Sequence, residues 1–270
     1  MSMGKTVLIT GVSSGIGQSI ARKLAGDGHK VIGTARNPQT VDQIEGVEIL
    51  PLDVRVDASV AACMRAALDR NPRIDVLINN AGYVMIGAIE EVSIEEAKAQ
   101  FETNFFGAMR MVKAVLPAMR ARRDGHIVNI TSLAGLIPAP PFWGLYSASK
   151  HALEAYTEHL WREVSFFNVR VSLVEPGPIR THLTRNQQSP AEGSDVYAPW
   201  RDKALEVSRT SEANAPDPSV VADCIARLLS SPSPRLHNRI GKEATWVPRL
   251  RCMLSEGQFE RVIRRVFNLS

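Results

Sequence analysis

The chain has 270 residues, of which 44% are hydrophobic and 22% are charged, and its formal net charge is +4. These proportions are those of a folded globular protein and exclude an intrinsically disordered chain. No apolar run reaches the ~18 residues that a membrane span needs, and the first residues lead into a strand-like segment rather than a signal peptide, so we expect a cytoplasmic protein without stable membrane insertion. The basic residues are mostly dispersed, which favours a solvated surface over a nucleic-acid partner. The three cysteines and six histidines show no ligand spacing, so we expect reduced thiols and no metal site.

Apolar segments bounded by turn residues alternate with segments of helical spacing along the chain. This alternation is typical of βαβ units and of a parallel sheet covered by helices on both faces. Because no linker divides the chain, we predict a single-domain α/β fold with a doubly wound parallel sheet of about seven strands, and ligands beyond the strand carboxyl ends. The predicted strands are 6–10, 30–34, 47–50, 76–79, 126–130, 170–174 and 236–240, and the predicted helices are 16–26, 59–68, 94–119, 146–166 and 219–229.

The first predicted strand ends in a glycine-rich turn, residues 10–17 (Thr-Gly-Val-Ser-Ser-Gly-Ile-Gly), and a helix follows. Glycines in such a turn let the backbone approach a ligand closely, and the new helix directs free N–H groups and its positive dipole end at a phosphate. We predict a phosphate-binding loop that includes Gly11, Gly15, Ile16 and Gly17. A simple strand-to-helix turn is the alternative.

The second predicted strand ends in Ala35-Arg36. Enzymes that use NAD usually place an acidic residue here to hold the ribose 2′-hydroxyl, whereas an arginine accommodates the 2′-phosphate of NADP. The sequence therefore predicts NADP, with Ser13, Ser14 and Asn37 as supporting donors. The alternative is that Arg36 is a solvated surface cation.

Polar and small residues follow the third and fourth predicted strands. Asp53 could accept a hydrogen bond from an adenine amino group while Val54 donates its backbone N–H, although Asp53 could equally belong to a helix cap. The fourth strand closes with Asn79-Asn80-Ala81-Gly82, whose small residues would let the backbone approach a cofactor and whose amides could join neighbouring strands. A plain turn would also explain this segment.

A helical segment begins near Tyr146, and Lys150 lies four residues later. The two side chains can reach one site on a single helix face, where the ammonium would lower the pKa of the phenol from ~10 and make it an acid/base group. Ser132 lies at a strand end and could donate to a substrate oxygen. Asn104 interrupts a good helical pattern, which suggests a functional use. Structural alternatives exist for all of them. Tyr146 and Lys150 could be a chance pair on a solvated helix, Ser132 could be a helix cap, and Asn104 could mark a helix irregularity.

In their order and spacing, these motifs resemble the short-chain dehydrogenases/reductases over roughly residues 5–240. The resemblance implies a Rossmann-type fold and a catalytic tetrad. Tyr146 would protonate a carbonyl oxygen as hydride arrives from NADPH, and Ser132 would orient that oxygen. Lys150 would lower the Tyr146 pKa and bind the nicotinamide ribose, and Asn104 would hold a water that relays protons to Lys150. Departures from the family pattern are small: Thr131 replaces a common serine, and Glu175 a common asparagine.

The resemblance further implies that residues 176–181 hold the nicotinamide amide, through Pro176, Gly177, the Ile179 backbone and the Thr181 hydroxyl. The most similar branch prefers NADP and includes hydroxysteroid and retinol dehydrogenases. We therefore expect an NADP(H)-dependent oxidoreductase that interconverts a carbonyl and a secondary or primary alcohol on an apolar, medium-sized substrate. A catalytically silent NADP-binding sensor or scaffold is the alternative. Expected pocket residues are Tyr83, Met85, Leu133, Phe142, Trp143, Pro178 and Leu183.

We expect the family domain to span residues 1–243, with a substrate lid at 182–216 and a helical extension at 244–270. In the extension, Phe259 and Val262 begin an apolar stripe at helical spacing, with arginines on other faces. So short a stripe favours packing on its own domain or a partner subunit over binding to an anionic membrane. The helix at 101–119 resembles the family's dimer helix, which predicts a homodimer or homotetramer.

Overall fold

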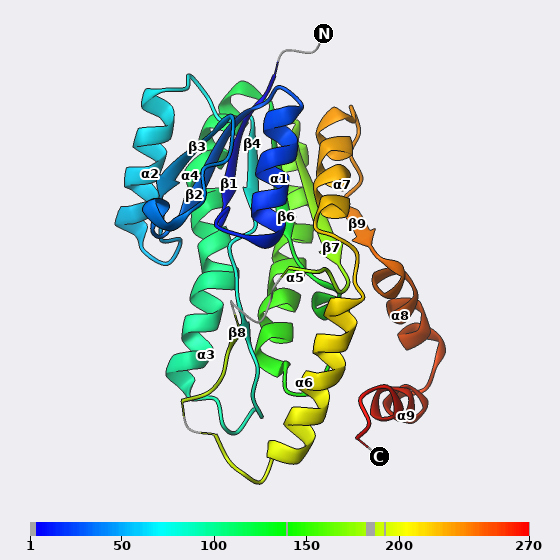
Figure 1. The fold of residues 1–270 in the computed structure, drawn as a ribbon. Helices are drawn as coiled ribbons and strands as arrows, with labels where there is room; N and C mark the ends of the chain where they lie inside the picture. Colours follow the sequence, from blue (N-terminus) through cyan, green and yellow to red (C-terminus); the bar gives the residue numbers. More distant parts are fainter. Residues whose placement is uncertain (1–3, 139, 182–186, 192, 270) are drawn as a thin grey trace.

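A computed structural model describes residues 4–138, 140–181, 187–191 and 193–269. At its centre is a parallel sheet of seven strands in the order β3-β2-β1-β4-β6-β7-β9 (Figure 1). All seven predicted strands are present within two residues of the expected bounds, so the predicted single-domain, Rossmann-type α/β fold is confirmed. The strands are β1 (Thr6–Thr10), β2 (Lys30–Ala35), β3 (Val47–Pro51), β4 (Val76–Asn79), β6 (Gly125–Ile130), β7 (Val169–Pro176) and β9 (His237–Ile240).

Side chains of the central strands are buried on both faces of the sheet. In β1, Val7 and Ile9 join the core on one face of the sheet, whereas Leu8 joins the core on the other face. This alternation follows from the two-residue period of a strand and explains why the strands read as continuous apolar runs. The helices flanking the sheet are α1 (Gly15–Gly26), α2 (Asp57–Asp69), α4 (Gly107–Arg122), α5 (Gly144–Ser165) and α7 (Ser219–Ser230).

The long helix predicted at 94–119 is divided into three parts. An α-helix, α3 (Ile94–Phe101), is followed by a π-helical segment, η2 (Glu102–Phe106), and then by α4. A π-helical segment is rare and is often found at a functional site. Asn104 lies in this segment with its side chain buried, so the residue that looked out of place in the sequence marks a real irregularity of the helix.

A helix and two short strands beyond the carboxyl edge of the sheet were not predicted. The proposed lid contains the helix α6 (Ala198–Ala213) and a short strand β8 (Gln187–Gln188), which pairs with β5 (Val84–Met85). Residues 182–186 and 192 of that segment lie outside the described residues. The C-terminal part forms α8 (Lys242–Met253) and α9 (Glu256–Val266), which lie to the right of α6 in Figure 1. Across the ranges that the structure describes, none of the helices could cross a membrane.

Candidate active site

The glycine-rich turn joins β1 to α1 in a conformation that depends on glycine. Gly11 and Gly15 have φ values of +75° and +58°, a region that other residues rarely adopt. A Cβ atom on Gly17 would lie 2.1 Å from the Gly11 carbonyl oxygen and 2.4 Å from Asn80 Nδ2. Ser14 is the N-cap of α1, and its side chain makes no capping hydrogen bond within the described chain. The turn therefore fits a phosphate group, which the helix N-terminus would bind.

Asn80 and Ala81 join this turn to the end of β4 through hydrogen bonds. Asn80 Nδ2 donates to the backbone oxygens of Thr10 and Gly11, at 3.0 and 2.8 Å. The Ala81 N–H donates to the Thr10 hydroxyl at 3.0 Å. Gly82 faces Asn104, whose Oδ1 would lie 3.1 Å from an added Cβ. The amides of this segment thus join neighbouring strands, as the sequence predicted.

At the other end of the expected cofactor site, Asp53 is paired with a residue that the sequence reasoning missed. Arg55 binds its carboxylate through two nitrogens, at 2.9 and 2.6 Å, and thereby holds the pKa of Asp53 below its usual range. Arg36 is exposed nearby and lowers that pKa further. Val54 is buried, and Ser13 is exposed at the turn.

The predicted pair Ser132 and Tyr146 meets at the carboxyl end of β6. The two side chains share a hydrogen bond, although Tyr146 lies in the first turn of α5 and Ser132 is the second residue after β6. Ser132 also caps the short helix η3 (Leu133–Gly135), where its hydroxyl accepts from the Ala134 N–H at 3.1 Å. The Ser132 hydroxyl therefore both caps η3 and contacts Tyr146, and the cap fixes its position.

Burial controls the pKa values of Tyr146 and Lys150. It raises the pKa of Tyr146, against the smaller effect of the Ser132 hydrogen bond. It lowers the pKa of Lys150 to about 8, opposed by the charge of Glu154. Lys150 Nζ lies 5.8 Å from the Tyr146 ring centre and donates to the Ile130 carbonyl at 2.9 Å. The sequence predicted that Lys150 would lower the Tyr146 pKa; the net shift of that pKa is upward because burial has the largest effect.

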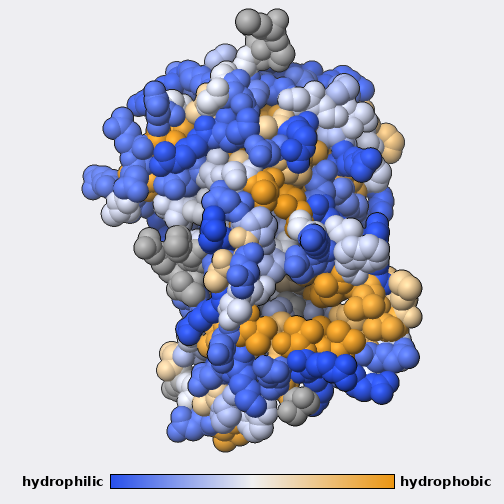
Figure 2. Space-filling view, turned by 45° about the vertical axis from the view of Figure 1, so that its right-hand side comes forward, coloured by the Kyte–Doolittle hydropathy of each residue, from blue (hydrophilic) through white to orange (hydrophobic). Residues whose placement is uncertain are grey.

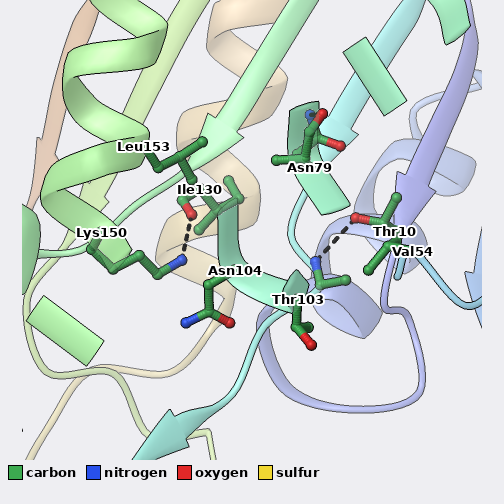
Figure 3. Close-up of a pocket in the computed structure, with 10 residues that line it drawn as sticks. Thr10, Val54, Asn79, Thr103, Asn104, Ile130, Lys150 and Leu153 are labelled. Carbon is green, nitrogen blue, oxygen red and sulfur yellow. Dashed lines mark hydrogen bonds between the residues drawn. The ribbon is translucent and has the colours of Figure 1, made fainter. Parts of the chain in front are cut away.

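Lys150 and Asn104 face each other across a small cavity of about 10 Å³ (Figure 3). A polar cavity of this size has room for about one water. The Asn104 amide is already bonded: Nδ2 donates to the Tyr83 carbonyl at 3.0 Å and to Ser149 Oγ at 3.1 Å, and Oδ1 accepts from the Tyr83 N–H at 3.1 Å. The cavity, rather than a free amide, thus offers a place for the predicted relay water.

A larger cavity of about 370 Å³ opens beside Ser132 and Tyr146. The segment expected to hold a nicotinamide contributes to its wall, together with Ile16 from α1. Thr181 also lies against the glycine turn, because a Cβ on Gly15 would be 3.4 Å from it, and its N–H donates to Glu212 of α6. The members of this segment in the wall are Pro176, Gly177, Ile179 and Thr181.

The expected apolar pocket is found in part. Leu133, Trp143 and Pro178 line the large cavity, and Phe142 lines a neighbouring groove. Tyr83 and Met85 are not among the described lining residues of either, because they join the strand segment next to Asn104. Leu183 lies outside the described residues.

The C-terminal helices form a wall that the sequence reasoning missed. Figure 2 shows apolar side chains gathered around a hollow in the lower half of the molecule. The sequence showed the apolar stripe of α9, but helical spacing alone does not indicate which surface such a stripe covers. The residues of α8 and α9 that line the cavity include Val247, Leu250, Phe259, Val262, Ile263 and Val266.

Residues 5–192 match the family model described as short chain dehydrogenase. The chain belongs to the short-chain dehydrogenase/reductase family. This short-chain dehydrogenase/reductase is 38% identical over 252 residues to a 3-ketodihydrosphingosine reductase of Bacteroides thetaiotaomicron, covering 90% of this chain and 93% of that one. It is 40% identical over 255 residues to retinol dehydrogenase 8 of Homo sapiens, covering 87% and 81%. The protein is thus an oxidoreductase that acts on a small-molecule substrate.

Solved structures of the family resemble this oxidoreductase closely. A short-chain dehydrogenase from Streptomyces avermitilis superposes with a TM-score of 0.84 at 33% identity, over 98% of each chain. A relative from Burkholderia phymatum in complex with NAD gives 0.82 at 27% identity, over 93% of each chain. A metagenomic oxidoreductase in complex with NADP gives 0.71 at 29% identity, over 89% of this chain and 100% of that one. The family neighbours therefore bind NAD or NADP.

Proposed function

We propose that this short-chain dehydrogenase/reductase is an NADP(H)-dependent enzyme that interconverts an apolar, medium-sized carbonyl compound and its alcohol. The observation that carries this proposal is the 370 Å³ cavity, in which apolar side chains surround the paired hydroxyls of Ser132 and Tyr146. Cavities of this size and character take small organic ligands. The names of the two curated relatives, which specify 3-ketodihydrosphingosine and retinol, support a carbonyl/alcohol couple.

In this proposal NADPH supplies the hydride when bound, and the side chains of the site manage the proton. The Tyr146 hydroxyl donates its proton to the carbonyl oxygen during reduction and takes it back during oxidation. Ser132, held by its cap, donates to the same oxygen and orients it. Lys150 lies close enough to stabilise the phenolate that remains after the transfer. The raised Tyr146 pKa keeps the proton on the phenol until the substrate oxygen becomes basic.

The identity of the proton donor can be tested with Tyr146→Phe. We expect kcat for ketone reduction to fall about 10²–10⁴-fold, the usual contribution of a general acid, while NADPH binding, followed by fluorescence, is retained. Retained activity in the variant would show that another group donates the proton. A wild-type protein that binds NADPH but reduces no member of a panel of apolar and charged ketones would support the silent-binder alternative.

The preference for NADP rests on Arg36, which is exposed and directly follows β2. The uncharged Ala35 occupies the position at which NAD-dependent enzymes usually carry an acidic residue. A charged hydrogen bond to the 2′-phosphate is worth about 1.5–3 kcal/mol, so Arg36→Ala should raise KM for NADPH about 10- to 100-fold and leave KM for NADH unchanged. Arg22→Ala, an exposed arginine on α1, is the matched control. Equal changes for both cofactors would exclude recognition of the 2′-phosphate by Arg36.

A further inference from the structure

A second polar cluster lies behind the proposed active site. It consists of Glu154, one helical turn after Lys150 on α5, Glu175 on β7, and His237 on β9. A carboxylate oxygen of each glutamate and a ring nitrogen of His237 all lie within 4.8 Å of one another. Glu154 is 6% exposed and Glu175 is fully buried, whereas 39% of the His237 side chain is exposed. The cluster therefore extends from the turn that carries Lys150 to the protein surface.

The buried carboxyl groups have few partners. Within the described residues, three carboxylate oxygens have no hydrogen-bond partner: both oxygens of Glu154 and Oε2 of Glu175. The nearby Thr131 hydroxyl has a single proton, which can go either to Glu154 or to the Val174 carbonyl that it contacts at 3.2 Å. Two ionised carboxylates buried this closely would be costly. A proton or a cation held in the cluster would reduce this cost.

The charged groups around the cluster act against a metal ion. Arg239 Nε of β9 lies 3.7 Å from Glu175 Oε2, and Lys150 faces Glu154 from α5. His237 Nδ1 is bonded to Glu175 Oε1 at 2.7 Å. The positive charges of Arg239 and Lys150 oppose the entry of a metal ion. They also stabilise the ionised carboxylates, so it is burial that favours protonation of the pair. Glu158 of α5 is a third carboxylate that faces the cluster, and its charge also favours protonation of the buried pair.

The pKa values agree with this view. Burial, followed by the charges of neighbouring carboxylates, raises the pKa of Glu154 to about 8. Burial also raises the pKa of Glu175, against the effect of His237 and Arg239. The pKa of Lys150 is likewise about 8. Burial thus moves the pKa values of Lys150 and Glu154 toward each other, which lowers the cost of a proton transfer between them.

Close packing connects the cluster to the proposed active site. A Cβ on Gly135, at the end of η3, would lie 3.0 Å from Glu154 Cγ and 3.0 Å from the Lys150 carbonyl oxygen. Glu154 is thus held under the segment that begins with Ser132. Residues four apart on a helix lie about 5–6 Å apart at Cβ, so the side chains of Lys150 and Glu154 are within reach of each other.

We propose that Glu154, Glu175 and His237 form a proton path between Lys150 and solvent. The inference rests on the proposed function, because each carbonyl reduction consumes one proton that the buried Tyr146 and Lys150 must recover. Glu154 gives its proton to the Lys150 amine, takes one from Glu175, and Glu175 is reprotonated from solvent through His237. Each step breaks one O–H or N–H bond and forms another, no electrons move, and oxidation runs the path in reverse. All three residues act through Lys150, and none of them touches the substrate or the cofactor.

Single-turnover kinetics of His237→Ala test the path. Hydride transfer is followed by NADPH absorbance and proton uptake by a pH-indicator dye. In the wild type the two should coincide. In the variant proton uptake should lag, with a rate at least about threefold slower than hydride transfer, and imidazole should remove the lag. His159→Ala, an exposed histidine on α5, should show no lag. Coincident traces in His237→Ala, or a lag that imidazole leaves unchanged, would overturn the path.

A second measurement does not depend on activity and separates failure of the path from failure of the proposed function. Carbon-13 NMR of labelled glutamate carboxyls should show Glu154 titrating near its raised value of about 8, and at a lower pH in Glu175→Gln. Ionisation of Glu154 near its ordinary value of ~4.5 in the folded wild type would overturn the proposal. So would a rise in melting temperature with Zn²⁺ or Mn²⁺ that is lost in Glu175→Gln, because the cluster would then be a metal site.

Discussion

Two glycines of the same helix have different consequences at the scale of single residues. Gly17 has no room for a side chain, because a Cβ would lie 2.1 Å from the Gly11 carbonyl oxygen, whereas nothing lies within 4 Å of a Cβ on Gly26. Gly17→Ala should displace the turn and weaken NADPH binding at least about tenfold, or ~1.4 kcal/mol. Gly26→Ala should bind normally and gain about 0.5–1 kcal/mol of stability. Fluorescence titration and denaturant unfolding check both, and normal binding by Gly17→Ala would contradict a phosphate site at this turn.

His126 should couple stability to pH. Its side chain is buried in β6, with Nε2 3.0 Å from Ser172 Oγ, and burial lowers its pKa to about 3. The unfolded chain takes up a proton below pH ~6.5, whereas the folded protein does so only near pH 3. Stability should therefore fall as the pH falls through this window. Between pH 7 and 5 the wild type should lose about 2 kcal/mol more than His126→Gln in urea unfolding; equal losses would show that His126 titrates normally.

At the scale of elements, α9 decides how the proposed substrate cavity is closed. Ile263 lines the cavity, whereas Arg261 is exposed and bonded within the helix to Gly257. Ile263→Ala removes apolar contact area worth about 1–2 kcal/mol, so KM for large apolar ketones should rise about tenfold while KM for small ketones stays the same. Arg261→Ala should change neither value. An equal effect of Ile263→Ala on small and large ketones would show that α9 does not contact the substrate.

The interruption of one helix shows how an element positions a side chain. The π-helical segment between α3 and α4 turns Asn104 inward, where its amide holds the Tyr83 backbone and Ser149 of α5. A regular α-helix through this region would change the direction of every later side chain, because the extra residue shifts the helical phase. The small cavity next to Lys150 therefore depends on an irregularity.

At the scale of the whole molecule, exposed aromatic side chains predict self-association. Phe105 stacks edge-to-face on Phe106 and on Tyr156 of α5, at 5.0 and 5.8 Å between ring centres. Phe106 nevertheless remains 39% exposed, and Trp161 further along α5 is 42% exposed. Burial of these rings between two copies would provide a driving force for association. Light scattering should show a homodimer or homotetramer for the wild type and a monomer for Phe106→Arg; a wild-type monomer at micromolar concentration would contradict this.

Local patterns determined the sheet, the glycine turn and the order of the motifs. Strand and helix periods depend on neighbouring residues, and a turn such as Gly11–Gly15 needs glycine for reasons of backbone sterics, so both can be read from the sequence. The tertiary structure alone decided the direction of the Tyr146 pKa shift, the wall formed by α9, and the proximity of Glu154 to Glu175 and His237. These depend on burial and on segments far apart in the chain, which no local period specifies.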